Sequence, residues 1–145
     1  AYFDVGRPRW PGHIGLVLGW LPHLTRIDRV ARRYGRSVVF TEAGLPSVVG
    51  ATQRPWQWPS GKETPDLALQ AAGYDALFLA AGQMPWFEGV FWWKYYERPE
   101  QTPHVVDYSP KGKPAEQVLE SWYRGKSRLP PVDIDPRIRP VNGAP

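Results

Sequence analysis

No cysteine occurs among the 145 residues, so the chain has neither a disulfide framework nor a thiolate metal site. The three histidines, His13, His23 and His104, are scattered and lack the spacing of metal ligands. No apolar run approaches the ~20 residues of a membrane span, and no signal peptide is visible. We therefore expect no metal, no cofactor and no membrane span. The compartment stays open, because large secreted enzymes often do without disulfides.

Aromatic residues, by contrast, are abundant at 14% of the chain, with eight Trp, seven Tyr and five Phe. Such a surplus often lines a site for flat or ring-shaped ligands.

The net charge is +4, and five of the arginines lie between residues 26 and 36. Helical spacing spreads these five around a solvated face, and no nucleic-acid-binding motif accompanies them. We therefore expect no nucleic-acid partner.

The segment that organises the chain is the apolar, β-branched run at residues 38–41, which ends in Glu42. The run predicts a buried strand, and Gly44 and Pro46 then start a loop. Ionisable side chains at the carboxyl ends of parallel strands form the active sites of open α/β sheets and (β/α)8 barrels. Glu42 is therefore the candidate for chemistry. The alternative is a strand-end carboxylate in an ion pair with an arginine.

Other elements alternate along the chain. The first half is expected to hold a strand end at 1–4, a Gly/Pro-rich loop at 6–15, a helix with Pro22 near its first turn and Gly35 at its end, and the strand to Glu42. A long loop at 44–64 follows, and then a helix at 66–81 with Thr64 as N-cap and Pro65 at N1. The last expected elements are a strand at 89–93 and a helix from Lys113-Pro114 to Gly125. We expect the two later strands to be adjacent and parallel, joined by a right-handed crossover. This alternation predicts an α/β fold with a parallel sheet.

Three strands do not close a barrel, and a (β/α)8 barrel typically takes about 250 residues. The chain also begins with Ala, inside what looks like a strand end. We therefore expect the C-terminal portion of a TIM barrel, about its last three strand–helix units, with the rest of the barrel upstream. Residues 1–128 would belong to that catalytic domain, and the Pro-rich residues 129–145 would form a strap or a disordered tail.

Four segments resemble glycoside hydrolase family 113, a family of (β/α)8 retaining glycosidases that contains β-mannanases. They are Val39–Ser47, Gly50–Trp58, Gly89–Lys94 and Asp107–Ala115, and the resemblance covers about residues 1–125. It implies that Glu42 is the nucleophile at the seventh strand, that Tyr2 hydrogen-bonds and orients it, and that Trp93 floors the subsite where the bond breaks. The acid/base glutamate of this clan has no counterpart in the chain and would lie upstream.

The chemistry of the residues agrees with these implied roles. A Tyr hydroxyl beside a nucleophilic carboxylate favours its charged form, and the faces of sugar rings stack on indoles. Trp92, Trp56 and Trp58 are therefore further candidates for substrate binding. Because strand residues two apart share a face, Trp92 packs under the helices if Trp93 faces the sugar. Trp56 and Trp58 could equally be loop anchors.

The sequence thus predicts a retaining glycoside hydrolase acting on a β-linked oligo- or polysaccharide, with endo-β-1,4-mannanase implied by the resemblance. Extracellular or cell-envelope location is favoured over the cytoplasm. The 145-residue segment alone is expected to be inactive, because it lacks the acid/base carboxyl. Three alternatives remain open: a non-catalytic carbohydrate-binding barrel protein, a retaining glycosidase for another β-glycan, and an unrelated α/β module whose basic surface binds an acidic partner.

Overall fold

The computed structural model describes residues 1–6, 12–96 and 105–125. Within these residues, helices and strands alternate along the chain. Their bounds are α1 (His13–Tyr34), β1 (Val38–Ala43), α2 (Leu67–Ala81), β2 (Phe87–Trp92) and α3 (Pro114–Tyr123). The predicted Pro-rich tail at 129–145 lies outside the described residues, as does the boundary at 128.

The two strands form one parallel sheet, in the order β1-β2. The prediction that they are adjacent and parallel is confirmed, and α2 lies between them in the chain, as an α/β crossover requires. The right-handedness of this crossover stays a prediction. The pairing is irregular after Phe40, which pairs with Val90, because the next paired residue of β1 is Ala43. Glu42 lies in this irregular stretch.

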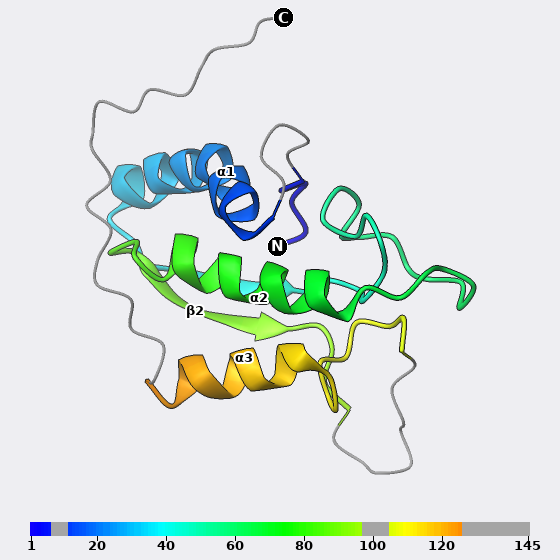
Figure 1. The fold of residues 1–145 in the computed structure, drawn as a ribbon. Coiled ribbons are helices and arrows are strands. Elements are labelled where there is room, and N and C mark those ends of the chain that lie inside the picture. The colour runs from blue at the N-terminus through cyan, green and yellow to red at the C-terminus, as the bar shows by residue number, and fades with distance from the viewer. Residues whose placement is uncertain (7–11, 97–104, 126–145) are drawn as a thin grey trace, which may run out of the picture.

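The three helices cover the sheet as one layer. Figure 1 shows α2 crossing in front of the strands with α1 on one side and α3 on the other. One apolar core joins α1, β1 and α2, with Trp20, Phe40 and Leu77 among its buried side chains. A second core joins α2, α3 and the segment that precedes α3, and it includes Phe78 and Leu119. The strands therefore owe their position mainly to the apolar faces of the helices.

One face of the sheet has no such cover among the described residues. Val39 of β1 and Phe91 of β2 are 44% and 68% exposed, while Phe40 is buried beneath the helices. Successive strand residues point to opposite faces, so Val39 and Phe91 lie on the open face. Apolar side chains on both faces are typical of strands that are buried on both sides in parallel sheets.

The amino end of α1 differs from the sequence prediction, which placed Pro22 near its first turn. The helix begins at His13, and Pro22 lies inside it. The helix thus includes 13–15, which were predicted as loop. Within it, Gly19 is a packing residue, because a Cβ on Gly19 would stand 2.2 Å from the carbonyl oxygen of Val5. Only glycine lets the helix approach that backbone. The predicted end at Gly35 is confirmed, with φ 58° in the left-handed region.

Two smaller predictions are also wrong. Residues 1–4 form no strand; the chain is instead tied to the long loop, since the amides of Val5 and Gly6 both donate to the carbonyl oxygen of Thr52. The N-cap of α2 is Asp66 rather than Thr64, because the Asp66 carboxylate accepts from the amide of Leu69 at 2.9 Å. No helix within the described residues has the length and apolar character needed to cross a membrane.

Candidate active site

Glu42 is the next-to-last residue of β1 and its side chain is exposed. It therefore lies at the carboxyl end of the parallel sheet, where the loops that follow both strands leave the fold. Within residues 1–6, 12–96 and 105–125, Glu42 makes no ion pair. The arginines between residues 26 and 36 are exposed on and after α1. The described residues therefore contain no ion pair between Glu42 and an arginine, which was the alternative interpretation.

Tyr2 lies beside Glu42. Burial raises the pKa of the Tyr2 phenol, and the negative charge of Glu42 and a hydrogen bond to the Glu42 side chain raise the same pKa further. A phenol that stays protonated donates a hydrogen bond to the carboxylate and so stabilises the charged carboxylate. The structure therefore brings together the two residues for which the sequence predicted a nucleophile and its orienting donor.

Trp93 follows β2 directly and reaches the same end of the sheet. Its amide donates to the carbonyl oxygen of Ala43 at 2.7 Å, and its peptide bond to Lys94 is cis. A Cβ on Gly44 would stand 2.1 Å from the Trp93 carbonyl oxygen, so the chain after β1 can pass this close only with glycine at position 44. The Trp93 side chain is 43% exposed. Its indole is thus placed at the strand ends with surface left to contact a ligand.

Trp92 faces the other way. Its ring stacks on Tyr74 of α2 with centroids 4.1 Å apart and planes 11° apart, and its Nε1 donates to the Tyr123 hydroxyl of α3 at 3.1 Å. The parity expectation, that Trp92 packs under the helices when Trp93 lies at the site, matches this placement. The indole of Trp92 therefore contributes to packing between sheet and helices.

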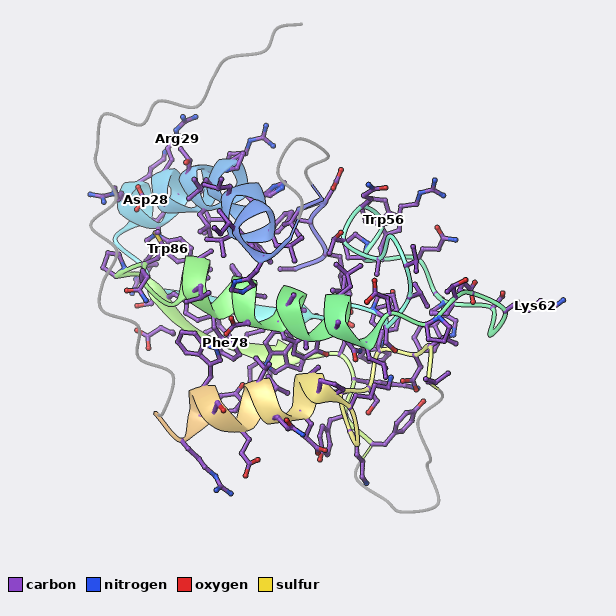
Figure 2. All side chains as sticks on the ribbon, in the orientation of Figure 1. Asp28, Arg29, Trp56, Lys62, Phe78 and Trp86 are labelled. Atoms are coloured by element: carbon purple, nitrogen blue, oxygen red, sulfur yellow. The ribbon has the colours of Figure 1, made fainter. Side chains whose placement is uncertain are left out.

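The two loop tryptophans have different surroundings. Trp56 is 59% exposed and stands on the long loop after β1, at the end of the molecule opposite Asp28 and Trp86 (Figure 2). Trp58 stacks on Tyr108 with centroids 5.1 Å apart. Its ring also lies 5.0 Å from the ammonium of Lys94. Trp58 is thus linked to the segment after β2.

Tyr108 is the residue of this site that sequence reasoning missed. It is 2% exposed, and its ring meets Tyr2 edge-on with centroids 6.3 Å apart. Burial raises the pKa of its phenol to about 12. No periodicity marks the segment around Tyr108, so the only available signal was its place in the Asp107–Ala115 segment.

Chemically, the cluster offers one carboxylate, one phenol donor and exposed indoles. The carboxylate can attack, or stabilise, a positively charged carbon, and the indoles can stack on an apolar ring face. Glu42 is the only carboxylate whose charge acts on the pKa of Tyr2 among the described residues.

Residues 7–124 match the family model described as Glycoside Hydrolase Family 113. Among solved structures, the chain is similar to a GH113 β-1,4-mannanase solved as a complex, with 30% identity and a TM-score of 0.65 over 77% of this chain. It is also similar to the GH113 β-mannanase AaManA from Alicyclobacillus acidocaldarius in complex with ManMIm, with 28% identity and a TM-score of 0.65 over 75% of this chain. The chain spans 36% of the length of each of these two proteins. No curated protein matches it.

Proposed function

Because the chain belongs to Glycoside Hydrolase Family 113, we propose that it carries the nucleophile half of a retaining β-1,4-mannanase active site. The observation that carries this proposal is the contact between Tyr2 and Glu42 at the carboxyl end of β1. A nucleophilic carboxylate must stay ionised, and a partly buried phenol donor beside it favours that state. The mannanases that the chain resembles supply the substrate class.

The fold that we propose for the complete protein is a (β/α)8 barrel, with this chain as its C-terminal portion. Its support is the parallel β1-β2 pair, the helix layer on one face, and the exposed Val39 and Phe91 on the other. In a barrel, that second face is the interior and is filled by side chains from the other strands. A chain that spans 36% of the related mannanases fits about three of eight strand–helix units, and the described residues contain three helices and two strands of that set. Residues 1–128 would then belong to the catalytic domain, and a polymer substrate favours an extracellular location.

Retaining hydrolysis proceeds in two displacements. In the first, a Glu42 oxygen bonds to the anomeric carbon while the glycosidic C–O bond breaks, and an acid protonates the departing sugar oxygen. In the second, water attacks the same carbon, the bond to Glu42 breaks, and the acid residue accepts the proton of the water. Tyr2 donates to Glu42 while it is a carboxylate. The acid/base residue would come from the part of the barrel outside this chain, about 5–5.5 Å from Glu42.

Sugar binding falls to the indoles at the strand ends. Trp93 is proposed as the floor of the subsite at the broken bond, because its backbone is fixed beside Ala43 and its side chain stays partly exposed. Trp58 and Trp56 are proposed as contacts for neighbouring sugar units. Trp58 is connected to the site because it stacks on Tyr108, whose ring meets that of Tyr2. Trp92 is left out of this set because its ring lies against Tyr74.

The test is hydrolysis by the complete enzyme, meaning this chain together with the rest of the proposed barrel. We expect β-1,4-mannan to be cleaved, and proton NMR to show the β-anomer forming first, because two displacements retain configuration. The 145-residue chain alone should show no hydrolysis, since general acid–base catalysis contributes about 10²–10⁴-fold. An α-anomer as first product would contradict the retaining mechanism. Glycan binding without hydrolysis by the complete protein would favour a carbohydrate-binding barrel, and cleavage of another β-glycan alone would correct the substrate.

A further inference from the structure

We propose that Tyr108 is a positioning residue for this site, with two separable roles: its ring holds Tyr2 against Glu42, and its hydroxyl holds the turn that presents Trp58. The proposal rests on the proposed function, in which Glu42 is the nucleophile. It concerns a residue that donates to neither substrate nor nucleophile.

The backbone of Tyr108 is fixed by buried polar groups. Its carbonyl oxygen accepts from Gln70 Nε2 at 3.2 Å and from the Tyr74 hydroxyl at 3.2 Å, and both donors come from α2. The preceding residue, Asp107, pairs with the buried ammonium of Lys113 at 2.7 Å. Several buried hydrogen bonds on one backbone segment restrict the conformations that the segment can adopt. Tyr108 therefore enters the site from a segment that is tied to both α2 and α3.

The ring of Tyr108 lies beside both Tyr2 and Gly44, the residue that follows β1. It meets the Tyr2 ring at an interplanar angle of 89°, the edge-to-face arrangement that aromatic pairs favour. On the side of β1, its Cδ1 would lie 3.1 Å from a Cβ on Gly44, two residues beyond Glu42. A ring in contact with both Tyr2 and the chain after Glu42 sets the distance between them.

The hydroxyl of Tyr108 binds a different segment, the loop that follows β1. It donates to the carbonyl oxygens of Pro55 at 2.7 Å and Gln57 at 3.1 Å, so one hydrogen is shared by two acceptors. These carbonyls flank Trp56 and lead directly into Trp58, whose ring stacks on Tyr108 itself. Loss of the hydroxyl removes the hydrogen bonds that hold this turn, whereas loss of the ring removes the contact that holds Tyr2.

The two roles predict a split between kcat and KM in the complete enzyme. Tyr108→Phe keeps the ring and should leave kcat within about twofold while raising KM for manno-oligosaccharides several-fold, because Trp58 is no longer held. Tyr108→Leu removes the ring as well and should lower kcat about 10-fold or more, because the Tyr2 donor loses its position. Tyr34→Leu, at the exposed end of α1, is the matched control and should change neither constant.

A double-mutant cycle separates positioning from general damage. In a Tyr2→Phe background, where the donor hydroxyl is already absent, Tyr108→Leu should lower kcat less than twofold further. If Tyr108→Leu does not fold, Tyr108→Met replaces it in the same cycle. Equal losses of kcat in both backgrounds would overturn the positioning role of the ring, and an unchanged KM for Tyr108→Phe would overturn that of the hydroxyl. If Glu42→Gln and Tyr2→Phe themselves leave turnover intact, the proposed function fails instead.

Discussion

The amide of Trp93 donates a 2.7 Å hydrogen bond to the carbonyl oxygen of Ala43. This bond joins the residue after β2 to the residue after Glu42, and it continues the parallel ladder to the point where both strands end. The proposed nucleophile and the proposed sugar floor are therefore fixed relative to one another by main-chain atoms. A site built on strand ends keeps its geometry better than one built on loops alone.

Replacing Glu42 by Gln in the complete enzyme should lower kcat by a factor on the order of 10⁴ or more, because the amide cannot form the covalent intermediate. Oligosaccharide affinity, measured by tryptophan fluorescence, should stay within a few-fold, since the indoles remain. Glu88→Gln is the control, because Glu88 is exposed near the amino end of β2. Near-normal turnover of the Glu42 variant would place the nucleophile elsewhere.

Gly44→Ala should damage both stability and turnover. The added Cβ would meet the Trp93 carbonyl oxygen at 2.1 Å, and a backbone atom cannot move aside as a flexible side chain can. We expect a cost of about 2 kcal/mol in the free energy of unfolding, as for other overpacked sites, together with a fall in kcat. Gly73→Ala is the matched control, because its Cβ would meet only the end of the Leu45 side chain.

Urea denaturation and steady-state kinetics of both variants measure the two effects. Wild-type kcat in Gly44→Ala would show that the close approach of the strand ends is not needed for catalysis. A larger loss of stability in Gly73→Ala than in Gly44→Ala would contradict the packing argument itself.

The buried pair of Lys113 and Asp107 should be more costly to break than to remove. Burial lowers the pKa of Lys113, and the Asp107 carboxylate opposes that shift. Asp107→Asn leaves the buried ammonium without its charged partner and should cost about 3–5 kcal/mol of unfolding free energy. Asp107→Asn combined with Lys113→Met should cost less than Asp107→Asn alone, because no uncompensated charge remains.

The exposed pair of Arg124 and Glu120 on and after α3 provides the comparison. Glu120→Gln should change the free energy of unfolding by less than about 1 kcal/mol, since surface pairs contribute little. Urea titrations of the complete protein measure all three variants. Equal costs for the single Asp107 variant and the double variant would mean that the buried charge is not the source of the effect.

Glu63 should titrate well below an ordinary glutamate. Amides of Ser60 and Gly61 donate to its carboxylate at 2.9 and 3.0 Å, and these bonds lower its pKa to about 2. A lowered pKa in the folded state means that its stabilising bonds are fully present above about pH 4.5 and are lost as the pH falls toward 2. The Ser60 and Gly61 amide shifts should therefore show no titration step between pH 6 and 3. A step near pH 4.5 that disappears in Glu63→Gln would contradict this.

Much of the fold could be predicted from the sequence because its signals are local. The β-branched run before Glu42 predicted the strand β1, and Gly35 and Pro114 marked helix boundaries that the structure confirms. The start of α1 could not be predicted in the same way. Glycine weakens the sequence signal for a helix, and the reason for Gly19 appears only when the backbone of Val5 is seen to pass against it.

In the site as well, residues with a local sequence signal could be predicted, and residues that depend on distant contacts could not. Glu42, Tyr2 and Trp93 were predicted from strand ends and from a family resemblance, and the structure places all three at one end of the sheet. Their catalytic and binding roles stay predictions. Tyr108 escaped notice because its importance depends on contacts with residues 34 to 106 positions away in the chain. Such long-range packing leaves no pattern within a sequence window.

The position of α2 between α1 and α3 also determines how this part of the protein opens. Ala76 and Leu77 of α2 belong to one core and Tyr74 and Phe78 to the other, and Leu69 packs against both. Because α2 contributes to both cores, we expect the two to unfold as one cooperative unit. In native-state hydrogen exchange, the central amides of α2 should exchange more slowly than those near the end of α3.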